Sequence, residues 1–283
     1  MKHPARWRDT VDISSLPFHQ VKIKEIMGYP HAGNDVFHAM VMYQGSEMPA
    51  FIKVERQAGA DIANETNVIS NLPLPYVPII LEYSLSEPRY IVTKEAEGER
   101  LSTIVNQSPE TDVKKYLRKQ AAVLSEIHNV HVPCGPVKDR RFFHVPAPEF
   151  WEKHNLDAVH AFLTENEPVN PLSCFVHGDF HYANILWDRG EISCVLDYEL
   201  SGIGVREFDM AWSVFLRPSQ NHLKTWREVM AFLNGYTSEF SLLAFLYYYV
   251  QIAAHFYPMG DVQYKSDVQN LMEEAMRQYT EAV

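Results

Sequence analysis

Three polar residues near the middle of the chain have the chemistry of a metal-assisted reaction. They are Asp179, Asn184 and Asp197, all within residues 174–200. Carboxylate and amide oxygens are hard ligands that suit Mg²⁺, which leaves most of its coordination to water and phosphate. One carboxylate would remain outside the metal's ligand set. In a phosphoryl transfer it would receive the proton of the attacking hydroxyl group while the metal neutralises charge on the phosphates.

The sequence around these residues predicts a β-hairpin that brings them together. Residues 173–176, 184–187 and 192–196 are short apolar runs, and Asp188, Arg189 and Gly190 form a turn sequence between the last two. Such a hairpin places a loop carboxylate beside the end of its second strand. We therefore expect Asp179 and Asp197 to lie at one site.

This group of residues resembles the catalytic core of the aminoglycoside phosphotransferase and choline kinase family, which is related to the protein kinases. The resemblance implies that Asp179 is the catalytic base and that Asn184 and Asp197 hold Mg²⁺. It also implies that His177 and Asp209 support the catalytic loop. The matching residues are His177, Gly178, Asp179, Asn184, Asp197, Glu199 and Asp209.

Two departures from protein kinases favour a small-molecule acceptor. Tyr198 and Glu199 stand where protein kinases have Phe-Gly after the metal-binding aspartate, and no segment resembles an activation loop that ends in Ala-Pro-Glu. A zinc site at His177 and His181 is disfavoured because Gly178 and a loop setting do not suit a helical pair of ligands. A serine hydrolase is disfavoured because no Gly-x-Ser-x-Gly sequence occurs.

The first hundred residues predict a β-sheet that carries a lysine. Residues 21–27, 35–43 and 50–54 have strand patterns, and Lys53 lies in the third. Residues 61–72 predict a helix with Glu65 in its first turns. In the resembled family a strand lysine contacts the nucleotide phosphates and a helix glutamate orients it, so Lys53 and Glu65 would have these roles. Glu55 is nearer in sequence but shares the strand face of Lys53.

Two further segments of the N-terminal half match nucleotide contacts of the family. The turn 28–35, with Gly33 and Asn34, would cover the phosphates because these residues tolerate backbone angles that point N–H groups inward; a plain hairpin loop is the alternative. Residues 93–101 resemble the hinge, where the backbone of Lys94 and Ala96 would bind the purine. Because only backbone groups would contact the purine, the sequence does not distinguish ATP from GTP.

The remaining patterns predict two more strands and a series of helices. The strands are 79–83 and 89–92, which complete five. A helix is predicted to begin with Ser108 as N-cap and Pro109 in the first turn, and His128 near its end is expected to be a buried structural residue. The other helices are predicted over 148–164, 207–216, 220–233, 238–255 and 261–283.

The expected fold class is therefore α+β, a protein-kinase-like two-lobe fold with a small β-rich N-terminal lobe and a larger, mostly helical C-terminal lobe. Residues 1–95 would form the nucleotide-binding lobe. Residues 96–283 would form the catalytic and acceptor-binding lobe. The resemblance is specific in the central hairpin and covers most of the chain from about residue 21.

Composition indicates which binding partners and which cellular compartment to expect. A net charge of −11 over 283 residues argues against a nucleic-acid partner and mildly favours a cationic acceptor.

The three cysteines, Cys134, Cys174 and Cys194, form no close metal-ligand pair and are most simply explained by a reducing compartment. No secretory signal begins the chain, and the longest apolar run, 242–250, is too short to span a bilayer. A soluble cytoplasmic enzyme is expected.

The acceptor is the least determined element. An acidic pocket for an aminoglycoside, an aromatic box for a quaternary ammonium group and an ordinary metabolite such as homoserine or a sugar all remain open, as does a nucleotide-binding pseudoenzyme. Retention of Asp179, Asn184, Asp197 and Lys53 argues against the last. Oligomeric state is not predicted. The acidic candidates are Asp157, Glu165, Glu167, Glu199, Glu207, Glu273 and Glu274, and the aromatic ones are Trp212, Tyr247, Tyr248 and Tyr249.

Overall fold

The N-terminal part of the chain is an antiparallel sheet. The computed structural model describes residues 9–30, 33–56 and 59–283. Alternate residues of the second strand, among them Phe37, Ala39 and Val41, are completely buried, as the sequence alternation predicts. The strand order is β1-β2-β3-β5-β4. The strands are β1 (Val21–Gly28), β2 (Asp35–Tyr43), β3 (Ser46–Val54), β4 (Ile80–Ser84) and β5 (Tyr90–Lys94).

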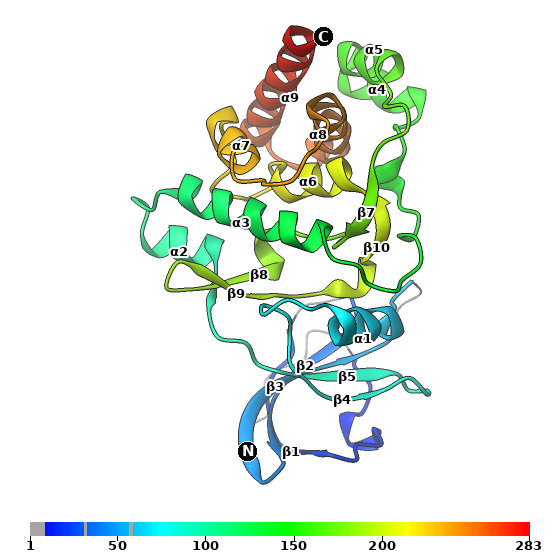
Figure 1. The fold of residues 1–283 in the computed structure, drawn as a ribbon, viewed down its shortest axis with the longest axis vertical. Coiled ribbons are helices and arrows are strands. Elements are labelled where there is room, and N and C mark those ends of the chain that lie inside the picture. Colours follow the sequence, from blue (N-terminus) through cyan, green and yellow to red (C-terminus); the bar gives the residue numbers. More distant parts are fainter. Residues whose placement is uncertain (1–8, 31–32, 57–58) are drawn as a thin grey trace.

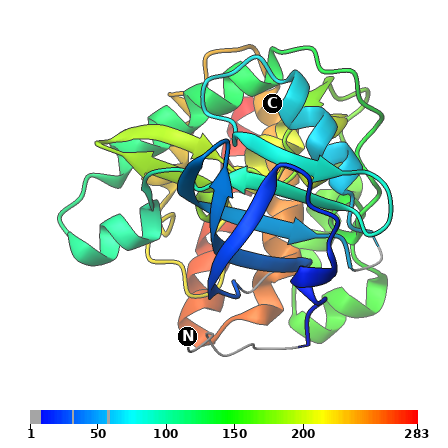
Figure 2. The same cartoon turned by 90° about the horizontal axis from the view of Figure 1, so that it is seen from below.

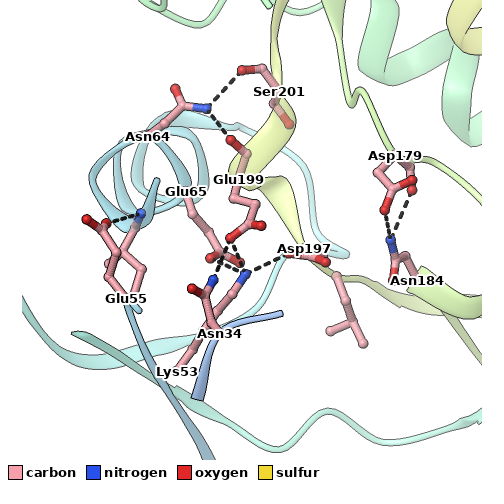
Figure 3. Close-up of polar contacts among 12 residues, drawn as sticks. Asn34, Lys53, Glu55, Asn64, Glu65, Asp179, Asn184, Asp197, Glu199 and Ser201 are labelled. Carbon is pink, nitrogen blue, oxygen red and sulfur yellow. Dashed lines mark hydrogen bonds and ion pairs between the residues drawn. The ribbon is translucent and has the colours of Figure 1, made fainter. Parts of the chain in front are cut away.

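One helix covers part of this sheet and connects it to the rest of the molecule. Helix α1 (Ile62–Asn71) begins at Asp61, whose side chain accepts a hydrogen bond from the backbone N–H of Asn64. The side-chain amide of Asn64 in turn donates to the carbonyl oxygens of Glu199 and Ser201, at 3.1 and 2.9 Å. These residues follow the central hairpin, so α1 is attached directly to the C-terminal part (Figure 3).

The C-terminal part is mostly helical, with small strand pairs between it and the sheet (Figure 1). The view from below shows the N-terminal sheet in front of the helices (Figure 2). The short strands form one three-stranded sheet in the order β6-β8-β9 and one antiparallel pair, β7 with β10. They are β6 (Glu99–Arg100), β7 (Ser173–Val176), β8 (Ile185–Asp188), β9 (Glu191–Val195) and β10 (Gly202–Val205). The helices are α2 (Leu101–Gln107), α3 (Val113–His128), α4 (Pro148–His154), α5 (Asp157–Glu165), α6 (Arg206–Val214), α7 (Trp226–Leu233), α8 (Leu242–Phe256) and α9 (Val262–Ala282).

The predicted hairpin is confirmed as β8 and β9. Arg189 and Gly190 both have positive φ, 49° and 80°, which is the backbone of a tight two-residue turn. The strand β7 does not pair with this hairpin. It pairs with β10, with Val176 opposite Gly202, and the loop that contains Asp179 therefore starts between two separate small sheets.

Some helix boundaries differ from the prediction. Ser108 is the C-cap of α2 and not an N-cap, and α3 begins at Val113 behind Asp112, whose side chain accepts from the N–H of Lys114. Residues 148–164 form two helices because Asn155 adopts a left-handed conformation, with φ of 55°, that ends α4. Helix α7 starts at Trp226, where Thr225 and Glu228 form a capping box.

The predicted fold class, a β-rich N-terminal part and a larger helical C-terminal part, is confirmed. Its two cores are distinct: one contains Phe37, Ile52 and Tyr90 within the sheet, and the other is built mainly from helices α3 and α6–α9. Among the described helices, none is both long and apolar enough to cross a membrane.

Candidate active site

A cavity of about 560 Å³ lies between the N-terminal sheet and the β8–β9 hairpin. Apolar side chains face it from both sides, including Val36 and Phe51 from the sheet and Leu186 and Leu196 from the hairpin, an arrangement that suits a flat purine ring. Six residues proposed from the sequence line this one cavity. They are Lys53, Glu65, Lys94, Ala96, Asn184 and Asp197.

Lys53 is the centre of a charge cluster at one end of the cavity (Figure 3). Its Nζ lies 2.9 Å from Glu65 Oε2 and 2.7 Å from Asp197 Oδ1. A third carboxylate, Glu199, is 2.9 Å away. The expected Lys53–Glu65 contact is therefore present. Glu55, the nearer alternative, instead pairs with Arg89 at 3.0 Å.

The three carboxylates and the burial of Lys53 have opposite effects on its pKa. Burial lowers the pKa of Lys53, but the surrounding carboxylates outweigh it and raise that pKa above its ordinary value. Burial raises the pKa of Glu65, and Lys53 opposes that effect. Lys53 thus stays protonated and can offer a fixed positive charge to a phosphate group.

Asn34 and Gly33, which were predicted to contact the nucleotide, lie outside the cavity lining. The Asn34 side chain is buried; its Nδ2 donates to Glu199 Oε2 at 2.9 Å, and its Oδ1 accepts from the N–H of Arg56 at 3.3 Å. Gly33 is exposed, and neither residue lines the cavity. The predicted turn 28–35 also contains His31 and Ala32, which lie outside the described residues. Its phosphate-covering role stays a prediction.

Two backbone N–H groups of the hinge segment already donate hydrogen bonds within the protein. The N–H of Lys94 donates to the carbonyl oxygen of Ile79 at 2.9 Å, and the N–H of Glu95 donates to Pro49 at 3.0 Å. Lys94 and Ala96 both line the cavity, and their backbone contacts with a purine stay a prediction.

Asp179 is held from two directions. Its Oδ1 accepts from the indole Nε1 of Trp212 at 2.8 Å, and its Oδ2 accepts from Asn184 Nδ2 at 3.1 Å. His181 Nε2 lies 3.5 Å from the same carboxylate. Burial would raise the pKa of Asp179, but His181, Trp212 and Arg217 together lower it to about 2. The carboxylate is ionised at neutral pH.

The backbone of this loop is anchored by Asp209 on α6. The N–H groups of His177 and Gly178 donate to its two carboxylate oxygens, at 3.1 and 3.0 Å. His128 Nε2 lies 3.1 Å from Asp209 Oδ2, and Tyr236 contacts the other ring nitrogen at 2.6 Å. All of these groups are buried, so His128 is the buried histidine expected beside the loop, in a network that fixes the loop backbone.

Gly178 has a conformation that other residues rarely adopt. Its φ is 80°, and a Cβ at this position would clash with the carbonyl oxygen of Leu200. The close approach places the start of the loop against the segment that follows Asp197. Glycine is therefore required for the start of the loop to approach Leu200 this closely.

Asn184 and Asp197 fit a Mg²⁺ ion by their chemistry. Asn184 uses Nδ2 to bind both the backbone oxygen and the carboxylate of Asp179, and among described residues its Oδ1 accepts no hydrogen bond. Asp197 has a φ of 68°, and its carboxylate faces the same cavity. An amide oxygen and a carboxylate oxygen on one cavity wall are suitable ligands.

Glu199 was considered for the acceptor site, but it lies with Lys53 on the nucleotide side. Carboxylate oxygens of Glu65, Asp197 and Glu199 are within 4.8 Å of one another. This concentration of negative charge around Lys53 can be neutralised by the lysine and by a divalent cation.

The other acceptor candidates do not gather around Asp179. Glu207 is buried and accepts from the N–H of Ser241 at 2.9 Å, and Glu274 pairs with Arg277. Tyr247 and Tyr249 are core residues, 2% and 0% exposed, whereas Tyr248 is partly buried and lines another cavity. Asp157, Glu165, Glu167 and Glu273 are exposed. His181 and Trp212 contact Asp179, and Arg140 and Arg217 interact with it electrostatically. Of these four residues, only Trp212 is among the acceptor-site candidates from the sequence.

The fold and this cavity are those of a phosphotransferase of the small-molecule kinase class. A model of the phosphotransferase enzyme family matches residues 51–239, and the chain belongs to that family. The predicted family, fold and general activity are confirmed at this level. A comparison with curated protein sequences gave no match.

Solved structures of aminoglycoside phosphotransferases share the fold. A thermostable mutant of APH(4)-Ia, in ternary complex with AMP-PNP and hygromycin B, is 16% identical with a TM-score of 0.60, over 90% of this chain and 94% of that one. The streptomycin–ATP complex of APH(2")-IIa is 17% identical with a TM-score of 0.58, over 83% and 84%. Spectinomycin phosphotransferase APH(9)-Ia, with ADP and spectinomycin, is 14% identical with a TM-score of 0.54, over 93% and 89%.

Proposed function

We propose that this chain transfers the γ-phosphoryl group of Mg²⁺·ATP to a hydroxyl group of a small molecule, with Asp179 as the general base. The observation that carries the proposal is the continuity between Asp179 and the nucleotide cavity. Asn184 bonds to Asp179 at 3.1 Å and lines the cavity together with Asp197 and Lys53. A base, two metal ligands and a phosphate-binding cation are thereby adjacent.

The reaction follows from these positions. The acceptor oxygen forms a bond to the γ-phosphorus, the bond from that phosphorus to the β–γ bridging oxygen breaks, and ADP leaves. The acceptor's proton passes to Asp179. Because the pKa of Asp179 is low, about 2, its main contribution is to orient the hydroxyl group and to accept the proton as the new bond forms.

Each remaining residue has a supporting part. Lys53, oriented by Glu65, binds the phosphates, while Asn184 and Asp197 would hold Mg²⁺, which supplies charge neutralisation on the β- and γ-phosphates. The backbones of Lys94 and Ala96 bind the base. Gly33 and Asn34 belong to the turn proposed to cover the phosphates.

Three further properties are proposed: the identity of the nucleotide, the division of the chain into lobes and the cellular location. ATP is favoured because the fold is shared with structures that contain ADP or AMP-PNP, and GTP is the alternative. The division of the chain at residues 95 and 96 into nucleotide-binding and catalytic lobes, and a cytoplasmic location, stay predictions from the sequence.

The test is a coupled assay of ADP and GDP release with Mg²⁺ against aminoglycosides, choline, homoserine and sugars. Release stimulated by one class and absent in Asp179→Ala would support the proposal and identify the acceptor. Nucleotide that binds without any release would favour the pseudoenzyme. Asp197→Ala should remove the Mg²⁺-dependent part of nucleotide binding, which a thermal-shift titration with and without the metal measures.

A further inference from the structure

A second cavity, of about 300 Å³, lies next to the catalytic loop and shares no lining residue with the nucleotide cavity. Gly178, the neighbour of Asp179, forms part of its wall, together with Asp209. Apolar side chains such as Phe143 and Phe208 form much of the remainder. Its volume is at the lower end of small-molecule sites, and its position beside the proposed base suits an acceptor.

A guanidinium group connects this cavity to the proposed base. Two charged residues line the cavity: Asp209, which already accepts hydrogen bonds from the backbone of the catalytic loop, and Arg140. The Cζ of Arg140 lies over two aromatic rings, 4.8 Å from the centroid of Phe143 and 5.1 Å from that of Trp212. Trp212 is the residue whose indole N–H bonds to Asp179. One aromatic side chain therefore contacts both the positive group and the proposed base.

The guanidinium group of Arg140 forms no ion pair and donates no hydrogen bond within the described part of the chain. No carboxylate of the described residues lies within ion-pair distance of its guanidinium, and none of its N–H groups donates to one of those residues. Burial lowers the pKa of Arg140, while Asp179 and Asp209 oppose that effect from a distance. Both of these carboxylates already accept other hydrogen bonds. A partly buried guanidinium in this position is suited to a ligand that supplies the anion.

Arg217 adds a second positive charge on the same tryptophan. Its Cζ lies 4.0 Å from the centroid of Phe215 and 5.4 Å from that of Trp212, and its Nη2 donates to the carbonyl oxygen of Trp212 at 2.7 Å. The residue is 9% exposed, and its buried Nη1 has no partner among the described residues. No carboxylate of the described residues lies within ion-pair distance of Arg217, and its charge acts on Asp179 from farther away.

We propose that the second cavity binds the acceptor and that this acceptor is a hydroxylated anion, whose carboxylate or phosphate group is held by Arg140. The inference rests on the proposed function and deepens it. The net charge of the whole chain favours a cationic acceptor. In this cavity, however, Asp209 is already hydrogen-bonded to the catalytic loop, whereas Arg140 has no carboxylate partner among the described residues. A polyamine placed in the cavity would meet the guanidinium group of Arg140.

The test uses acceptors matched in all but charge. ADP release is measured with 4-(hydroxymethyl)benzoate and its amide, with glycerate and its amide, with glycerol 3-phosphate and glycerol, and with kanamycin. The proposal predicts that at least one acid has a kcat/KM roughly 10–100-fold above its neutral partner, the usual effect of a charge-assisted hydrogen bond. The benzoate and glycerate pairs test for recognition of a carboxylate group, and the glycerol 3-phosphate pair tests for recognition of a phosphate group. A preference for kanamycin or the amides, or no discrimination in any pair, overturns it.

Variants assign the effect to Arg140. Arg140→Gln should raise the KM for the favoured acid about 10–100-fold and change that for the amide less than about threefold, and Arg140→Lys should recover part of the loss. The control is Arg141→Gln, an exposed neighbour that stacks on Phe142 and does not line the cavity. An equal loss for acid and amide in Arg140→Gln would mean a structural role and would overturn the assignment.

A binding experiment separates this inference from the proposed function. Calorimetry of each acid and amide into the complex with AMP-PNP and Mg²⁺ needs no turnover. If the acids bind preferentially but no ADP is released with any acceptor, the anion site stands and the transferase proposal fails. If ADP is released but acids bind no better than amides, the transferase stands and the anion site fails.

Discussion

The indole Nε1 of Trp212 donates to Oδ1 of Asp179 at 2.8 Å, so a side chain of helix α6 fixes the proposed base. Three residues earlier on the same helix, Asp209 accepts hydrogen bonds from the backbone of His177 and Gly178. Helix α6 therefore holds both the backbone and the side chain of the catalytic loop. Residues three apart on a helix lie on one face, which explains how one element does both.

Trp212→Phe should lower kcat about 10–100-fold and leave the KM for ATP nearly unchanged. The ring is retained for stacking, but the hydrogen bond that orients Asp179 is lost. The control is Trp226→Phe, because the buried indole N–H of Trp226 has no partner among the described residues. Steady-state ADP release on both variants measures the effect; wild-type kcat in Trp212→Phe would show that the contact is dispensable.

Asp209→Asn should destabilise the fold by about 2–4 kcal/mol, because one carboxylate oxygen that accepts from a buried N–H is replaced by an NH₂ group. His128 also loses its charged partner at 3.1 Å. The free energy of unfolding is measured in urea. A change below about 0.5 kcal/mol, the range of ordinary surface substitutions, would contradict the anchoring role.

Lys53→Met should weaken ATP binding about 10–100-fold, because three carboxylates then face the phosphates without their cation. Calorimetry measures the affinity. Lys24→Met is the matched control, since Lys24 pairs with Glu47 at the surface of the same sheet, at 3.6 Å. Equal affinity in Lys53→Met and Lys24→Met would remove Lys53 from the nucleotide site.

Stability should fall as the pH drops from about 6.5 to about 4 through His222. Burial, reinforced by Arg217, lowers the pKa of His222 from 6.5 to about 4. The unfolded chain therefore binds more protons between these pH values, and acidification favours unfolding, by at most about 3 kcal/mol.

His222→Gln should make the unfolding free energy less dependent on pH in this window, as urea titrations at pH 7, 5.5 and 4.5 would show. Burial also lowers the pKa of His177 and His181, so part of the dependence should persist. His131→Gln, at an exposed position, is the control and should keep the wild-type slope. An unchanged slope in His222→Gln would contradict the assignment.

The most accurate predictions from the sequence concern residues that lie close together along the chain. Asp179, Asn184 and Asp197 lie within one short segment, and the turn at Arg189 and Gly190 is sufficient to bring that segment together. Lys53 and Glu65 followed from the order of strand and helix. The resemblance to a kinase-like family then supplied the two-part arrangement that local patterns alone do not contain.

What the sequence missed depends on tertiary contacts. Trp212 is 33 residues from Asp179, and no local pattern indicates that its indole N–H reaches the carboxylate. Arg140 lies in an irregular proline-rich segment, where no periodicity predicts which way a side chain points. Ser108 was misassigned because Ser-Pro-Glu is typical of a helix start, whereas the preceding helix α2, which was not predicted, uses Ser108 as its end.

The most direct test of the central claim compares Asp179→Asn with the wild type in two measurements, ATP affinity by calorimetry and ADP release with the best acceptor. Asparagine keeps the shape of the side chain but cannot accept the proton. We predict an ATP affinity within about twofold of the wild type and a turnover lower by roughly 10²–10⁴-fold. Equal turnover would place the base elsewhere, and a parallel loss of ATP affinity would make Asp179 a structural residue.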